Sequence, residues 1–261
     1  MKAIKPIHVF NPSLFYVGSI WTHSSGTKMQ VVSYEDKFHV RVKFLDETGY
    51  ECVANIDNIK NGSVKNPYMK LKHGGYFGEG NIIASHNMNI YKTWDSMLVR
   101  TSSFSKNPSY SNTSVCQEWF CFQTFANWYI NYINHLNPKF NYHLDKDIFQ
   151  WNFQSKVYSP GTCCLIPDTL NMALVGMHVE RHNHSELPVG VMPNSNKFSS
   201  YITLEDKRVY LGNFETPMEA FNAYKIEKEK RIKELADFYF SENGITSQVY
   251  EKLYTITIEP F

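Results

Sequence analysis

Residues 142–171 bring together side chains of the types that acid–base and metal chemistry require. Two carboxylates, Asp145 and Asp147, flank Lys146 in the run HLDKDI, and His143 precedes them. A carboxylate can hold a divalent cation and an imidazole can act as a general base, so this run could activate water. Lys146 is a poor base, because the ordinary lysine pKa is about 10.4 and the neighbouring carboxylates favour its charged form.

Two residues in this run, His143 and Asp147, are candidates for the general base. If the run is a strand, alternation places His143, Asp145 and Asp147 on one face and Lys146 on the other. His143 is therefore no simple replacement for a base at position 146, and Asp147 could act as a weak base itself. The alternative is that LDKD forms a solvated turn on a scaffold without a metal.

The cysteines nearby allow two further interpretations. A zinc site could use Cys163 or Cys164 with four histidines, although the spacings match no standard zinc module; these are His143, His178, His182 and His184. A cysteine nucleophile could pair with His143 instead. The apolar neighbours in CCLIP favour buried, structural thiols over both the zinc site and the cysteine nucleophile.

Strands are predicted at the N-terminal side of this segment. Apolar residues alternate with polar ones in residues 18–68, at Val31, Tyr34, Phe38, Val40, Val42 and Phe44. Strands this short are most simply closed by a small barrel-like sheet. The glycine-rich run HGGYFGEGNII lacks the GKS or GKT ending of a P-loop, so no nucleotide cofactor is expected.

Helices and a second set of strands are predicted further along the chain. Residues 89–101 and 116–133 carry apolar stripes, and we expect the aromatic side chains of the second stripe to form core. Three short strands are expected within residues 189–217. The next helix starts with Thr216, Pro217 and Glu219, which form a capping box, and runs to about Phe240.

These elements predict an α+β fold in three parts. The parts are a β-rich domain at residues 1–72, a helical and ββα domain at 73–180, and a three-stranded sheet packed on a long helix at 181–261.

Composition limits the possible functions. The formal net charge is +1, so binding to nucleic acid would need a local basic face. The 15% share of aromatic residues suits cores, base stacking and protein interfaces alike. Five cysteines without a CxxC spacing are not a disulfide framework and favour a reducing compartment. Without a signal-like or long apolar run, we expect neither secretion nor a membrane span.

The segment HLDKDIFQWNFQSKVYSPGTCCLIPDTLN resembles the ββα element of HNH nucleases. The resemblance implies a site for Mg²⁺ or Mn²⁺ with Asp145 as the first ligand and Asn171 as the last. Asn152 would be the loop asparagine. The position of the catalytic histidine is occupied by Lys146.

The chain also resembles a group of phage and prophage proteins through NGSVKNPY, GGYFGEG, YKTWDSMLVR and VCQEWFCFQTFANW. Its C-terminal run YLGNFETPMEAFNAY resembles the APETALA2-type DNA-binding domain, in which three strands lie in the major groove of DNA. This implies DNA-facing side chains at Lys197, Ser199, Tyr201, Thr203, Lys207 and Arg208.

We therefore expect a phage-type protein of the HNH homing-endonuclease kind that binds double-stranded DNA in the cytoplasm of an infected bacterial cell. Nicking or cleavage would require its degenerate site to be active. The alternative is a phage protein without enzymatic activity that binds and inhibits a host protein, which the aromatic surplus also fits.

Overall fold

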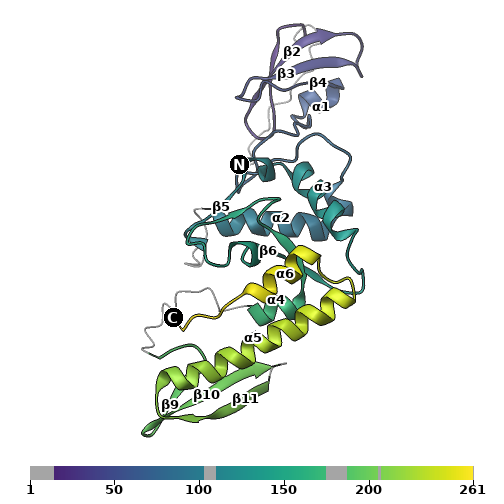
Figure 1. Ribbon diagram of the computed structural model, residues 1–261. Coiled ribbons are helices and arrows are strands. Elements are labelled where there is room, and N and C mark those ends of the chain that lie inside the picture. The colour runs from purple at the N-terminus through teal and green to yellow at the C-terminus, as the bar shows by residue number, and fades with distance from the viewer. Residues whose placement is uncertain (1–14, 103–109, 175–186, 205–206, 261) are drawn as a thin grey trace, which may run out of the picture. The chain divides into compact units, whose positions relative to one another are not determined.

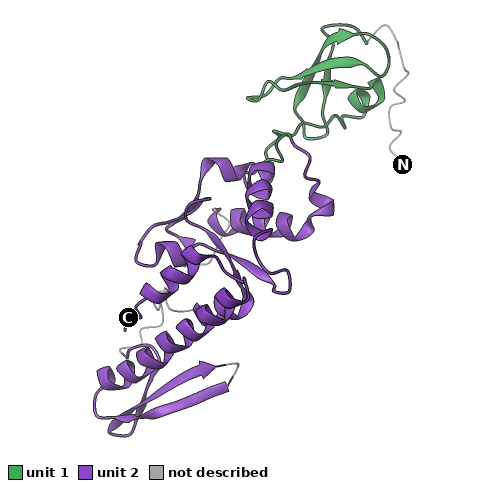
Figure 2. Ribbon diagram, turned by 45° about the vertical axis from the view of Figure 1, so that its right-hand side comes forward, with its two compact units in different colours: residues 1–71, 76–79 green, residues 72–75, 80–261 purple. Residues whose placement is uncertain are grey.

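The computed structural model describes residues 15–102, 110–174, 187–204 and 207–260. The fold is mixed α+β, with several small sheets rather than one large one (Figure 1). The chain divides into two compact units, which Figure 2 colours separately. Unit 1 comprises residues 1–71 and 76–79, and unit 2 comprises residues 72–75 and 80–261. Within the described residues, no helix has both the length and the apolar character needed to cross a bilayer.

Unit 1 is a four-stranded antiparallel meander followed by a short helix. Its elements are β1 (Ile20–Thr22), β2 (Lys28–Tyr34), β3 (Val40–Phe44), β4 (Glu51–Ala54) and α1 (Ile56–Lys60). The predicted alternation holds at Val31, Val40, Val42 and Phe44, which are buried. It fails at Tyr34 and Phe38, which are exposed. Tyr34 is the last residue of β2, and Phe38 lies in the turn before β3.

The first part of unit 2 is built around aromatic side chains. Its helices are α2 (Met88–Thr101) and α3 (Phe122–Ile133), which follow the 3₁₀ turns η2 (Ala84–His86) and η4 (Gln117–Phe120). The single predicted helix over 116–133 is thus a 3₁₀ turn and an α-helix. The aromatic stripe is core, as expected: Trp119, Phe122 and Phe125 are fully buried. Trp94 adds a hydrogen bond of 2.7 Å from its indole N–H to the carbonyl of Trp119.

The middle part of unit 2 has a ββα arrangement. Strand β6 (Tyr142–Asp145) pairs antiparallel with β8 (Cys164–Pro167), and α4 (Asp168–Leu174) follows at once. The connection between the two strands contains the 3₁₀ turn η5 (Ile148–Gln150) and β7 (Lys156–Tyr158). Strand β7 pairs in parallel with β5 (Thr113–Val115). All four residues of β8 are buried.

The last part of unit 2 packs a three-stranded antiparallel sheet on a long helix, as expected. The strands are β9 (Val191–Asn194), β10 (Lys197–Leu204) and β11 (Lys207–Phe214), and β10 lies in the centre. Helix α5 (Pro217–Ser241) starts with the predicted capping box of Thr216 and Glu219. It lies along one face of the sheet (Figure 1), and α6 (Ser247–Thr255) packs against it. The other sheet face has no helix on it in the described part of the chain.

The ββα unit and a candidate nucleic-acid interface

Asp145 is buried at the end of β6, where it caps the following turn. Its side chain is 6% exposed, and its Oδ1 accepts hydrogen bonds from the amides of Asp147 and Ile148, both at 2.8 Å. Burial raises its pKa to about 6, and the negative charge of Asp147 acts in the same direction. The two amide hydrogen bonds and Lys146 oppose this rise without cancelling it.

Asp147 lies between two ammonium groups. Its Oδ1 is 2.9 Å from Nζ of Lys146 and 2.5 Å from Nζ of Lys156. Burial disfavours the ionised carboxyl, but the two lysines outweigh this effect and hold the pKa of Asp147 below its ordinary value. Lys146 also lies 5.1 Å from the centre of the Tyr110 ring and 6.0 Å from that of Tyr158. Lys146 is thus a buried ion-pair and cation–π partner.

These contacts do not fit a divalent cation at Asp145. A cation there would compete with two backbone amides for Oδ1, and it would lie near the ammonium group of Lys146, which already neutralises Asp147. Within the described residues, no group of three or more His, Cys, Asp or Glu side chains is placed to hold a metal ion. The contacts of Asp145 and Asp147 therefore do not support metal-dependent hydrolysis at this site.

The other candidates from the ββα segment lie at its surface. The exposed imidazole of His143 contacts Asp168 in α4, with 2.6 Å between Nε2 and Oδ1. Asn152 is exposed in the turn after η5, and Asn171 is half-buried in α4. His143 and Asp145 differ in burial although alternation predicts one face. Asp145 is the last residue of β6, and its side chain turns inward to the amides.

The cysteine candidates behave as buried thiols. All five cysteines are free, and Cys163 and Cys164 are almost fully buried. Burial raises the pKa of Cys163 to about 12 and that of Cys164 well above its ordinary value, so neither is a ready nucleophile at neutral pH. The histidines of the proposed zinc site, His178, His182 and His184, lie outside the described residues.

The sheet of β9, β10 and β11 has a core face and an outer face. Phe198, Ile202 and Leu204 of β10 pack toward α5 in the hydrophobic core. Because side chains alternate along a strand, their neighbours point the other way. The outer face of the sheet, as used below, therefore contains Lys197, Ser199, Tyr201 and Thr203 of β10 and their partners in β11, which are Arg208, Tyr210 and Asn213.

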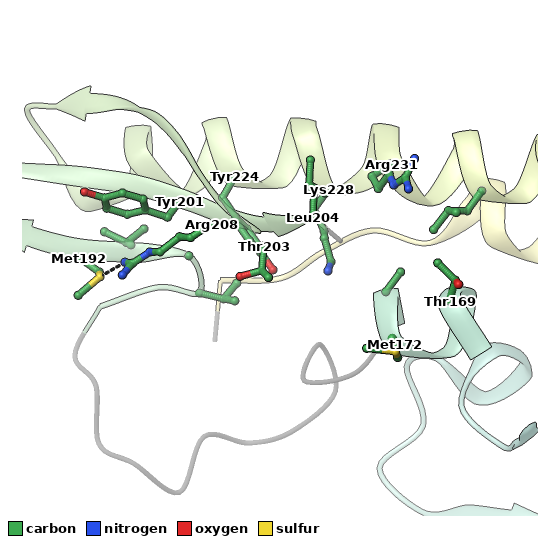
Figure 3. A pocket seen from close by; sticks show the side chains of 15 residues that line it. Thr169, Met172, Met192, Tyr201, Thr203, Leu204, Arg208, Tyr224, Lys228 and Arg231 are labelled. Carbon is green, nitrogen blue, oxygen red and sulfur yellow. Dashed lines mark hydrogen bonds between the residues drawn. The ribbon is translucent and has the colours of Figure 1, made fainter. Parts of the chain in front are cut away.

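The outer face carries an ordered set of polar and aromatic contacts. The guanidinium of Arg208 lies over the Tyr201 ring and donates a hydrogen bond to the sulfur of Met192 (Figure 3). The hydroxyl of Ser199 and the amide of Asn194 both donate to Oδ1 of Asn213, at 2.6 and 3.1 Å. Sequence reasoning missed Tyr210, Asn213 and Asn194, which the pairing register brings to this face.

The structure separates the predicted DNA-facing residues Lys207 and Arg208. Lys207 pairs with Leu204, whose side chain points to the core face, whereas Arg208 pairs with Thr203 of the outer face. Lys207 therefore lies on the helix side of the sheet at its exposed end. Lys197 lies on the outer face, where its Nζ is 2.5 Å from Glu215. Both partners are at least half exposed, so this pair contributes little to stability.

Comparison with known proteins identifies no relative, so the function of the chain has to be inferred from these residues. No protein-family model, no curated protein and no solved structure matches the chain.

Proposed function

We propose that the chain binds double-stranded DNA through the outer face of the β9–β11 sheet. The observation that carries this proposal is a row of polar and aromatic side chains on a face that no described helix covers. Thr203, Arg208, Tyr210 and Asn213 are exposed in this row, whereas Tyr201 is half-buried and Ser199 is buried. The major groove admits a small antiparallel sheet, and the edges of its bases offer donors and acceptors that such side chains match.

Individual contacts support particular roles on DNA. Arg208 is the natural candidate for a guanine edge or a phosphate, because its planar guanidinium can form two parallel hydrogen bonds. Asn213 already accepts hydrogen bonds from Ser199 and Asn194, so its amide group is held in place on the face. Lys197 can exchange its exposed partner Glu215 for a phosphate at small cost.

The near-neutral chain predicts that this binding is modest and depends on few phosphate contacts. A fluorescence-anisotropy titration of a labelled duplex, repeated over a salt series, tests it. We expect saturable binding whose logarithmic affinity falls linearly with the logarithm of salt concentration, with a shallow slope. Absence of saturable duplex binding at low salt would overturn the proposal.

The proposal does not include cleavage of DNA. Asp145 is engaged with backbone amides and Asp147 with two lysines, and these contacts favour a scaffold role for the HNH-like segment. The proposed place of action is the cytoplasm of an infected bacterial cell, which the five free cysteines support.

A second candidate function is binding of a host protein. It is favoured by exposed aromatic side chains on α5 and α6, where Phe240 and Tyr250 stack with ring centres 4.5 Å apart. Phe238 is 51% exposed and Tyr254 40% exposed in the same region. Aromatic residues are enriched at the centres of protein interfaces. A pull-down that retains one host protein at high salt, after nuclease treatment, would favour this candidate over DNA binding.

A further inference from the structure

A pocket lies at the edge of the C-terminal sheet, between α4, β10 and α5 (Figure 3). Strand β9 pairs with β10 only from Lys197 to Ser200, so the second half of β10 continues beyond it. Thr203 and Leu204 of β10 line the pocket there, opposite Met172 of α4. Its volume of about 740 Å³ is in the range of sites for small ligands.

Lys228 is the unusual residue of this pocket. It comes from the middle of α5, its side chain is only 9% exposed, and it points into the space between β10 and α4 (Figure 3). Among the described residues, none accepts a hydrogen bond from its ammonium group or forms an ion pair with it. Burial lowers the pKa of Lys228. A buried ammonium without a partner is costly, and an anion would relieve that cost.

The surroundings of Lys228 strengthen the case for an anion. Arg208 and Arg231 line the same pocket, which brings three cationic side chains to its wall. Arg231 also forms an ion pair with Glu234, with 3.5 Å between Nη1 and Oε2. None of the described residues that line it is Asp or Glu. Hydroxyl groups of Thr169 and Thr203 add donors, and Met172, Met192, Leu204 and Leu235 supply apolar surface.

We propose that this pocket binds the phosphate group of a ligand, with Lys228 as the central ammonium donor and the arginines beside it. Phosphate matches three cationic donors and two hydroxyls better than a single carboxylate does, because it offers more acceptor oxygens. The apolar lining favours a phosphate attached to an aromatic or aliphatic body. This inference goes beyond DNA binding and does not depend on it, although Tyr201, Thr203 and Arg208 belong to both sites.

Phenyl phosphate is a suitable probe, and calorimetric titration into the full chain is the measurement. Phenol, which lacks the phosphate, is the matched neutral compound. We expect saturable binding of phenyl phosphate and none of phenol. The variant Lys228→Met keeps most of the side-chain volume without the charge, and we expect it to weaken binding by roughly tenfold to a hundredfold. Lys230→Met is the control, since Lys230 is exposed on the same helix and forms ion pairs with Glu227 and Glu234.

Loss of binding through misfolding can be separated from loss of the ammonium. Lys228→Met removes a buried charge that none of the described residues pairs with, so its melting temperature should equal or exceed that of the wild type. If it falls instead, Thr203→Val provides a second variant at the pocket wall that leaves Lys228 in place, and it should also weaken binding. Equal affinity of wild type and folded Lys228→Met for phenyl phosphate would overturn the proposal, as would no saturable binding at millimolar concentrations.

Two sources of the phosphate are distinguished by adding duplex DNA. If the source is a phosphodiester of bound DNA, the duplex displaces phenyl phosphate and Lys228→Met weakens binding of both. If it is a free phosphomonoester, Lys228→Met loses phenyl phosphate and keeps its duplex affinity. Binding of phenyl phosphate without any binding of duplex would support the pocket while removing the proposed DNA function.

Discussion

The guanidinium carbon of Arg208 lies 4.0 Å from the centre of the Tyr201 ring, so a cation of β11 is stacked on an aromatic side chain of β10. Tyr210 packs beside Tyr201, with ring centres 5.4 Å apart. This stacking orients the guanidinium on the outer face of the sheet before any ligand arrives. Preorganisation of this kind reduces the entropy lost when an arginine binds a base or a phosphate.

The adjacent residues Lys207 and Arg208 provide a matched test of the DNA interface. Arg208→Ala should weaken duplex binding about tenfold and reduce the salt slope by about one, because it removes one cationic contact. Lys207→Ala removes the same charge from the helix side and should change the affinity by about threefold or less. Anisotropy titrations over a salt series measure both. Equal losses in the two variants would contradict binding through the outer face.

Asp145 should influence stability as a capping group with an unfavourable charge. Asp145→Ala removes the acceptor for two amides and should destabilise the fold by about 2 kcal/mol or more. Asp145→Asn keeps an acceptor oxygen and removes the charge, so near neutral pH it should be as stable as the wild type or more stable. Chemical denaturation of the three proteins measures these differences. If both variants destabilise equally at neutral pH, the charge of Asp145 is required and the capping interpretation is wrong.

The same residue predicts a pH dependence. The pKa of Asp145 is raised from 3.8 to about 6 in the folded chain, so the folded state holds the proton more tightly than the unfolded state. Protonation of Asp145 therefore stabilises the fold below about pH 4. This stabilisation, which is at most about 3 kcal/mol, is lost as the pH rises to about 6. Relative to the wild type, Asp145→Asn should gain stability over this interval. Unfolding free energies at pH 4, 5, 6 and 7 test the trend, and a constant difference would contradict it.

The ββα unit should not cleave DNA with a divalent cation. We expect supercoiled plasmid incubated with the protein and Mg²⁺ or Mn²⁺ to remain supercoiled, as it does with EDTA, because Asp145 and Asp147 are held by other partners. Agarose gels of wild type and Asp145→Ala, prepared identically, provide the measurement. Nicking that requires the cation and disappears in Asp145→Ala would show that the HNH-like site is active.

Gly190 should be essential to the packing of the C-terminal sheet on α5. Its φ is +75°, and a Cβ at this position would collide with the Tyr224 ring. Gly190→Ala should cost about 2 kcal/mol or more, because both the backbone conformation and the packing oppose a side chain. Gly161→Ala is the control, since a Cβ there meets nothing within 4 Å. Thermal unfolding of both variants tests the difference, and similar losses would count against the assigned packing.

Local sequence determined those elements whose signals lie within a few residues of one another. The capping box at Thr216 and Glu219 marked the start of α5, because both hydrogen bonds of that motif join residues three apart. Alternation located β2, β3 and the strands of the C-terminal sheet for the same reason. The aromatic stripe at Trp119, Phe122 and Phe125 indicated a buried core, since so much apolar area is stabilised mainly by burial.

Only the tertiary structure decided which of these residues share a surface and which are already engaged in hydrogen bonds or ion pairs. Pairing of β10 with β11 placed Arg208 beside Tyr201 and Lys207 on the opposite side, and a strand's register depends on a partner elsewhere in the chain. The inward turn of Asp145 and the ion pairs of Asp147 depend on backbone amides and lysines whose positions no local pattern predicts. In the sequence, nothing distinguishes Lys228 from the other charged residues of the same predicted helix. Packing of α4 and β10 against α5 buries it, because burial depends on distant neighbours rather than on residue type.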